Sequence, residues 1–141
     1  MKAAGQSVGI DFTGLTDRSP NTLLAHMLSD HTLEKYGWKK QNEVQEKMFK
    51  GYFTEGIYPD ADALAYMARE CGLDEKEVRE ALADDGLRHK VTNMVAENNE
   101  KVVGGVPMFV INGRPAFSGA RDPSSFHMVF DVLLGYRREV R

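Results

Sequence analysis

The sequence predicts an α+β fold that is mostly helical, with a β-hairpin and one further helix at the C-terminal end. Three observations support this prediction. Apolar residues recur at helical spacing through most of residues 19–102. Asn112-Gly113 then stands between two short apolar runs, which is the strongest short-range sign of a hairpin because a type I′ turn needs positive φ at both central residues. Asp122-Pro123 opens a last amphipathic segment.

The first half of the chain is expected to begin with a short strand or extended segment, because Val8, Ile10 and Phe12 alternate with polar or small residues. Ser19-Pro20 then has the composition of a helix start, and this helix is expected to end near Tyr36-Gly37. A second helix is predicted over about 40–53, where apolar residues again follow the helical period.

Three more helices are expected before the hairpin. Asp60 is predicted to cap the first of them, and Gly72 to end it. Asp74, with Glu77 three residues later, resembles a capping box and is expected to open a short helix. The last of the three covers about 85–103. We therefore divide the chain into a helical region, 1–102, and a hairpin-and-helix region, 103–141.

The bulk composition excludes several classes of protein. The net charge of −3 argues against nucleic acid as a partner. No window approaches the roughly 18 apolar residues of a membrane span, and no apolar segment of a secretory signal follows Met1. The single cysteine, Cys71, forbids an internal disulfide, a Cys-x-x-C pair and a cysteine-built zinc site. We expect a cytoplasmic protein without a bound cofactor.

The isolated chemistry-bearing side chains favour structural interpretations. Cys71 shares a helical pattern with apolar neighbours, so we interpret it as a buried core residue rather than a reactive thiol. His26 and His31 are five residues apart and do not share a helix face, so no metal site is expected there. Ser118 is the only hydroxyl near the hairpin and has no base close in sequence.

Three motifs carry a resemblance to a known family. They are "SPNTLLAHML" (residues 19–28), "MFKGYFTEGIYPDADALAYMARECGLD" (residues 48–74) and "GVPMFVINGRPAFSGA" (residues 105–120). In this order and spacing the chain resembles the DsbA family of thioredoxin-like proteins, in particular its FrnE-like branch, which is related to 2-hydroxychromene-2-carboxylate isomerase and kappa-class glutathione transferase. The resemblance implies a DsbA-type helical insertion followed by the C-terminal half of a thioredoxin-like fold. It also implies that the active-site β-α-β unit, with its Cys-x-x-C motif, should precede Met1.

The resemblance further implies a candidate binding site without a catalytic group. In the family, the Val106-Pro107 bond is cis, and the backbone before the proline pairs with an extended substrate or with glutathione. Asn21 occupies a position that lies near the ligand in the isomerase relatives; the alternative, equally weighted, is that it only serves the first turn of its helix. No residue of this chain is expected to be catalytic.

Two functions remain open. The chain can be a protein related to thiol–disulfide oxidoreductases, inactive alone because it lacks the cysteine pair, or the remnant of a glutathione-dependent isomerase or transferase. It can instead be a non-catalytic binding module that uses the strand edge at Pro107 to hold a peptide. In both cases we expect the strand Met108–Ile111 to associate with a second copy of the chain, as a homodimer, or with a partner, because unpaired N–H and C=O groups on its edge are a template for strand addition.

Overall fold

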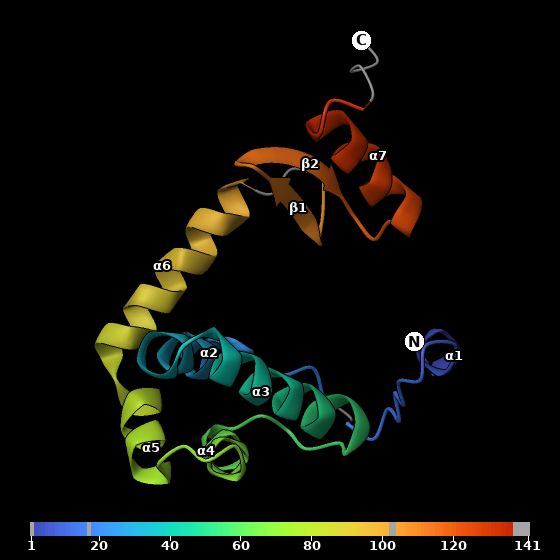
Figure 1. Cartoon of the computed structure of the whole chain (residues 1–141). Helices are drawn as coiled ribbons and strands as arrows, with labels where there is room; N and C mark the ends of the chain where they lie inside the picture. Colours follow the sequence, from blue (N-terminus) through green and yellow to red (C-terminus); the bar gives the residue numbers. More distant parts are fainter. Residues whose placement is uncertain (1, 17, 102–103, 137–141) are drawn as a thin grey trace. The chain divides into compact units, whose positions relative to one another are not determined.

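The structure of the protein is a computed structural model that describes residues 2–16, 18–101 and 104–136. Internal contacts divide the chain into two units, a helical unit, Met1–Met94, and a hairpin unit, Val95–Arg141 (Figure 1). The division falls within one helix, α6 (Asp85–Lys101). The boundary expected between residues 102 and 103 lies outside the described residues. The predicted α+β class, mostly helical with a two-stranded sheet, is confirmed.

The helical unit contains the helices expected before the hairpin, with shifted ends, and a short N-terminal helix that the pattern of apolar residues did not predict. Besides the start of α6, its elements are α1 (Lys2–Gln6), α2 (Leu23–Tyr36), α3 (Trp38–Phe49), the π-helical segment η1 (Lys50–Thr54), α4 (Ala61–Glu70) and α5 (Glu75–Ala83). The prediction that Ser19-Pro20 begins α2 is wrong by about three residues. Asn21 Oδ1 accepts a hydrogen bond from the backbone N–H of Leu23 at 3.0 Å, and this local turn takes the place of a helical first turn.

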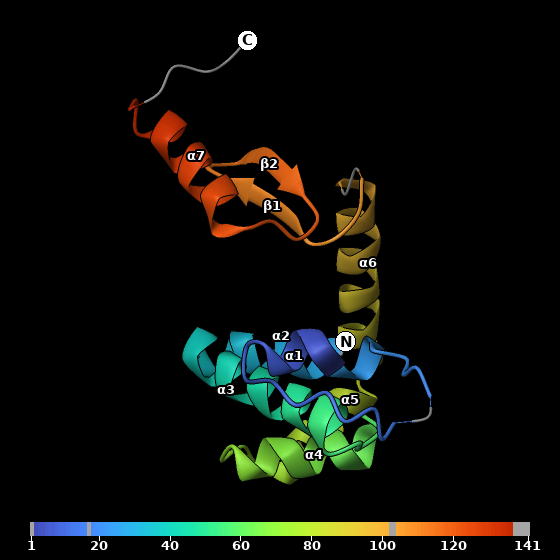
Figure 2. The same cartoon turned by 90° about the vertical axis from the view of Figure 1, so that its right-hand side faces the viewer.

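Helices α2 to α5 enclose the core of the helical unit (Figure 2). Its fully buried side chains lie on four different helices, so each helix contributes one apolar face. They include Met27 and Leu28 of α2, Val44 of α3, Leu64 and Met67 of α4, and Val78 of α5. The π-helical turn at the end of α3 brings Gly51 against Met67, where an added Cβ would lie 2.3 Å from Met67 Cε.

Of the two alternatives expected for the segment of Val8 to Phe12, a short strand or an extended segment, the strand is wrong. Residues 2–6 are helical, and none of the described residues between them and α2 joins a sheet. The segment instead lies along η1: the Phe12 ring packs edge-on against Phe53 at 5.4 Å, and the Thr13 hydroxyl donates to the carbonyl of Thr54 at 2.8 Å. Val8 remains 70 % exposed. The alternating pattern therefore reflects one aromatic contact and not a strand in a ladder.

Helix caps follow the sequence closely. The side chains of Asp60, Asp74 and Asp122 each accept a backbone N–H of the first turn of their helix. The expected capping box at Asp74 is only half formed. Glu77 N–H donates to Asp74, but the Glu77 carboxylate bonds to α2 instead of returning to the cap.

The hairpin unit consists of β1 (Met108–Ile111), β2 (Arg114–Ser118) and α7 (Pro123–Leu133). Asn112 and Gly113 have φ of 50° and 74°, which confirms the predicted turn. A bulge follows Phe109, so Phe109 pairs with Phe117 whereas Val110 pairs with Pro115. The rings of Phe109, Phe117 and Phe126 lie 4.9 Å apart in every pair, and this phenylalanine cluster holds α7 on one face of the hairpin.

Candidate functional site

The residues before β1 form the candidate site. The peptide bond between Val106 and Pro107 is cis. Gly104 and Gly105 precede it with φ of 93° and 113°, conformations that L side chains rarely adopt. The Pro107 carbonyl accepts the Gly119 N–H at 2.8 Å, which fastens this loop to the end of β2. Val106 is 77 % exposed, so the residue is accessible to a ligand.

The outer edge of β1 continues the site. In a hairpin with a two-residue loop, the pair next to the loop exchanges both hydrogen bonds and the following pair does not. Ile111 and Arg114 are the first pair, so the N–H and C=O of Val110 point away from β2. No other strand pairs with β1 in the part of the chain that the structure describes. Val110 therefore offers one donor and one acceptor on the same strand that begins at Pro107.

The opposite edge of the hairpin, that of β2, carries a proline: Pro115 is the residue that pairs with Val110. By the same register the backbone nitrogen of Pro115 faces the outer edge of β2, where a proline has no N–H to donate. Sequence reasoning did not identify this role of Pro115. A proline two residues after an Asn-Gly turn is the signal that could have revealed it.

Asn21 belongs to the helical unit, whereas Val106 and Pro107 belong to the hairpin unit. Its side-chain oxygen is engaged with the N–H of Leu23, and the residue is exposed. The structure therefore gives Asn21 a local role at the start of α2. A role near a ligand stays a prediction.

Cys71 lies at the C-terminal end of α4, in the core of the helical unit. It is 6 % exposed, and its Sγ lies 3.9 Å from the Glu43 carbonyl oxygen. Burial raises the pKa of the Cys71 thiol, and the nearby carboxylate of Glu43 adds to the effect. Because the thiolate is the nucleophile, this environment disfavours reaction of the thiol, and the burial agrees with the one expected from its helical pattern.

A cluster of polar side chains around Glu77 joins α2 to α5. Its carboxylate binds His31 Nε2 at 2.8 Å, accepts the Tyr36 hydroxyl and forms an ion pair with Lys35. The hydrogen bond from Lys35, followed by those from His31 and Tyr36, lowers the pKa of Glu77. The four groups satisfy one another, so we assign this cluster a structural role.

Neither a metal centre nor a membrane span is found in the described ranges. Residues 2–16, 18–101 and 104–136 contain no group of three or more histidine, cysteine, aspartate or glutamate side chains placed to hold a metal ion. No helix within these residues is both long enough and apolar enough to cross a bilayer.

The comparisons with known proteins agree with this architecture. The family model of the DSBA-like thioredoxin domain matches residues 1–131, and the chain belongs to this family. A solved structure, a probable DsbA oxidoreductase from Streptomyces coelicolor, superposes with a TM-score of 0.79 at 24 % sequence identity. The match covers 99 % of this chain and 60 % of the Streptomyces chain. No curated protein sequence matches the chain.

Proposed function

We propose that this chain is the substrate-binding part of a DsbA-like thiol–disulfide oxidoreductase of the FrnE-like branch. One observation supports the proposal most directly: Val106 is exposed beside Pro107, at the start of a strand whose outer edge is unpaired among the described residues. Strand addition supplies main-chain hydrogen bonds to an extended peptide, with little dependence on its side chains. The ligand is a peptide or protein thiol substrate; glutathione would be the ligand if the chain is instead a remnant of a glutathione-dependent isomerase or transferase.

The chain alone does not catalyse disulfide exchange in this proposal. Exchange passes through a mixed disulfide, and a second thiolate must attack that bond to release the substrate. Cys71 is the only cysteine, and its burial disfavours the thiolate that would start the reaction. The matched Streptomyces chain is longer than this sequence, and a cysteine pair has to come from a further segment or another chain. A single cysteine, which cannot form an internal disulfide, favours a reducing compartment such as the cytoplasm.

Two measurements test the proposal. In the insulin reduction assay with dithiothreitol, the chain and its Cys71→Ser variant should give the same rate; turnover of the chain well above the variant would contradict the inactivity. In an NMR titration, an extended peptide should shift the amide signals of Val106 and Val110. The matched control is the same peptide with N-methylated backbone amides, which lacks the donors for strand pairing and should not bind.

A non-catalytic binding module is the second candidate, favoured by the asymmetry of the hairpin edges. Only one of the two edges, that of β1, is free of a proline. A second copy of the chain could pair with it about a two-fold axis, which would satisfy Val110 in both copies. We expect a dimer in sedimentation at micromolar concentration and slow exchange of the Val110 amide. A monomer with a rapidly exchanging Val110 amide would exclude the dimer.

A further inference from the structure

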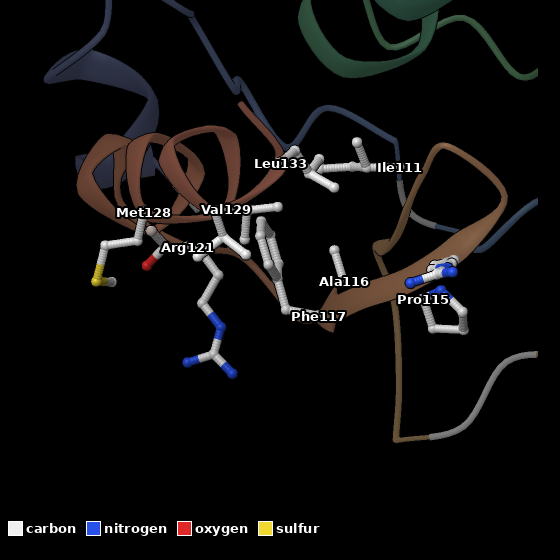
Figure 3. A pocket seen from close by; sticks show the side chains of 11 residues that line it. Ile111, Pro115, Ala116, Phe117, Arg121, Met128, Val129 and Leu133 are labelled. Atoms are coloured by element: carbon white, nitrogen blue, oxygen red, sulfur yellow. The ribbon is translucent and has the colours of Figure 1, made fainter. Parts of the chain in front are cut away.

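A groove separate from the candidate edge runs between β2 and α7 (Figure 3). Its volume is about 500 Å³, within the range of small-molecule sites. Neither Val106 nor Pro107 lines it, so it is not part of the site described above. Its walls are mostly apolar side chains from both elements: Ile111, Ala116, Phe117, Met128, Val129 and Leu133.

The position of the groove follows from the way α7 packs. The phenylalanine cluster fixes the first turn of α7 against one end of the hairpin. Toward the Asn112-Gly113 turn the same face carries Ile111 and Arg114, which are cross-strand partners and lie outside that cluster. Met128 and Leu133 are 50 % and 43 % exposed. The apolar surface is therefore left open along the length of β2.

Two arginines mark the ends of this groove. Arg114 is the first residue of β2, and Arg121 follows the last residue of the strand by three positions. Both line the groove and both are exposed. Figure 3 shows the guanidinium group of Arg121 turned away from Phe117 and Val129.

These arginines differ from the other described arginines in their partners. Arg69, Arg79 and Arg88 form ion pairs with neighbouring carboxylates, and Arg18 lies over the Tyr58 ring at 4.3 Å. Arg114 and Arg121 have no acidic partner anywhere in the ranges that the structure covers. Their charges are thus available to a ligand, at opposite ends of an apolar surface.

We propose that this groove binds a linear apolar molecule that carries a carboxylate at each end, an α,ω-dicarboxylate. Arginine recognises a carboxylate through its planar fork of donors, and the apolar chain covers the side chains between the two charges. The length of β2 sets the length of the ligand. The five residues of β2, at about 3.3 Å per residue, separate Arg114 from Ser118, three residues before Arg121, by about 13 Å, and an extended carbon chain of about ten to twelve bonds covers that distance.

The test is a calorimetric titration of the full chain with α,ω-dicarboxylates of increasing length. Affinity should rise by up to about fourfold per added CH₂ and then stop rising near about ten to twelve carbons. At that length the dicarboxylate should bind about two- to fivefold more tightly than the monocarboxylate of equal length, the range for one exposed ion pair. Arg114→Gln and Arg121→Gln should each abolish this advantage, and Arg88→Gln, on α6 and outside the groove, should not.

NMR locates the bound dicarboxylate on the chain. The Met128 methyl and the Ala116 amide should shift with the dicarboxylate, while the Val106 amide should not. Affinity that is independent of length or unchanged in both arginine variants would overturn the proposal. Shifts of Met128 that follow protein concentration rather than ligand would overturn it as well, because they would assign the groove to a second copy of the chain.

Discussion

The stability of the hairpin unit should depend on Phe126 more than on any other residue of α7. No residue of α7 is fully buried, so the helix has no core of its own. The Phe126 ring contacts Phe109 and Phe117 edge-on, at 4.9 Å in both cases and with interplanar angles of 90° and 86°. Phe126→Ala removes both contacts, the only ring contacts among the described residues that join α7 to the strands.

The loss of stability in Phe126→Ala follows from these two contacts and from the partial burial of the ring. Each edge-to-face pair contributes about 0.5–1.5 kcal/mol beyond area burial, and half-burial of a phenylalanine adds about half of its 1.5–3 kcal/mol, so the loss is about 2–4 kcal/mol. A hairpin is marginally stable by itself. The hairpin should therefore open locally while the helical unit stays folded.

Native-state amide hydrogen exchange measures this directly. The Ile111 amide, paired within the ladder, should exchange roughly 30- to 700-fold faster in Phe126→Ala, because each 1.4 kcal/mol is a factor of ten. Amides of Val44 and Leu64 in the helical unit should keep their protection. Phe130→Ala is the matched control, since Phe130 lies on the same helix, is 45 % exposed and makes none of these ring contacts. Equal effects of the two variants, or unchanged exchange at Ile111, would refute the reasoning.

Three further outcomes are expected. The lowered pKa of Glu77 means that its ionised form stabilises the fold above its ordinary pKa and that this stabilisation is lost as the pH falls through the folded-state value. Urea unfolding should show Glu77→Gln less stable than wild type at pH 7, by a deficit that shrinks as the pH falls below the ordinary glutamate pKa. A deficit that stays the same as the pH falls would contradict the ion pairing. Cys71 should react with a thiol reagent such as DTNB only after unfolding, and rapid labelling of the native protein would contradict its burial. Asp122→Ala should cost about 0.5–2 kcal/mol in α7 stability by amide exchange, whereas Asp122→Asn, which keeps a capping oxygen, should cost only a few tenths.

Local signals in the sequence predicted the parts of the fold that depend on local hydrogen bonds. The caps at Asp60, Asp74 and Asp122 join residues two or three positions apart, so the sequence contains both partners. The turn at Asn112-Gly113 depends only on backbone φ. These features were predicted at the residues where the structure has them.

Predictions failed where a distant partner competes with a local one. Glu77 was expected to complete a capping box, but Lys35 and His31 of α2 bind its carboxylate instead. The alternation around Ile10 was expected to mark a short strand or an extended segment, and the strand is excluded because no ladder reaches these residues within the described ranges. Such outcomes depend on which elements meet, which a periodic pattern does not specify.

The candidate site was predictable in part. The motif at Val106-Pro107 located it through a family resemblance, and its exposure and its link to Gly119 came only from the structure. The groove was not predicted. Arg114 and Arg121 are seven residues apart in sequence, and only the structure shows that both line one groove, with most of β2 between them.

The asymmetry of the hairpin gives the two candidate functions a common consequence. Pro115 removes a donor from the outer edge of β2, so an added strand has to join β1, beside Val106 and Pro107. A bound peptide and a second copy of the chain would both need the N–H and C=O of Val110, and one strand edge accommodates one partner. Peptide binding and dimerisation should therefore exclude each other: in sedimentation, saturating peptide should convert dimer to monomer, and the N-methylated peptide should leave the dimer intact. A dimer that binds peptide without dissociating would place at least one of the two partners somewhere other than β1.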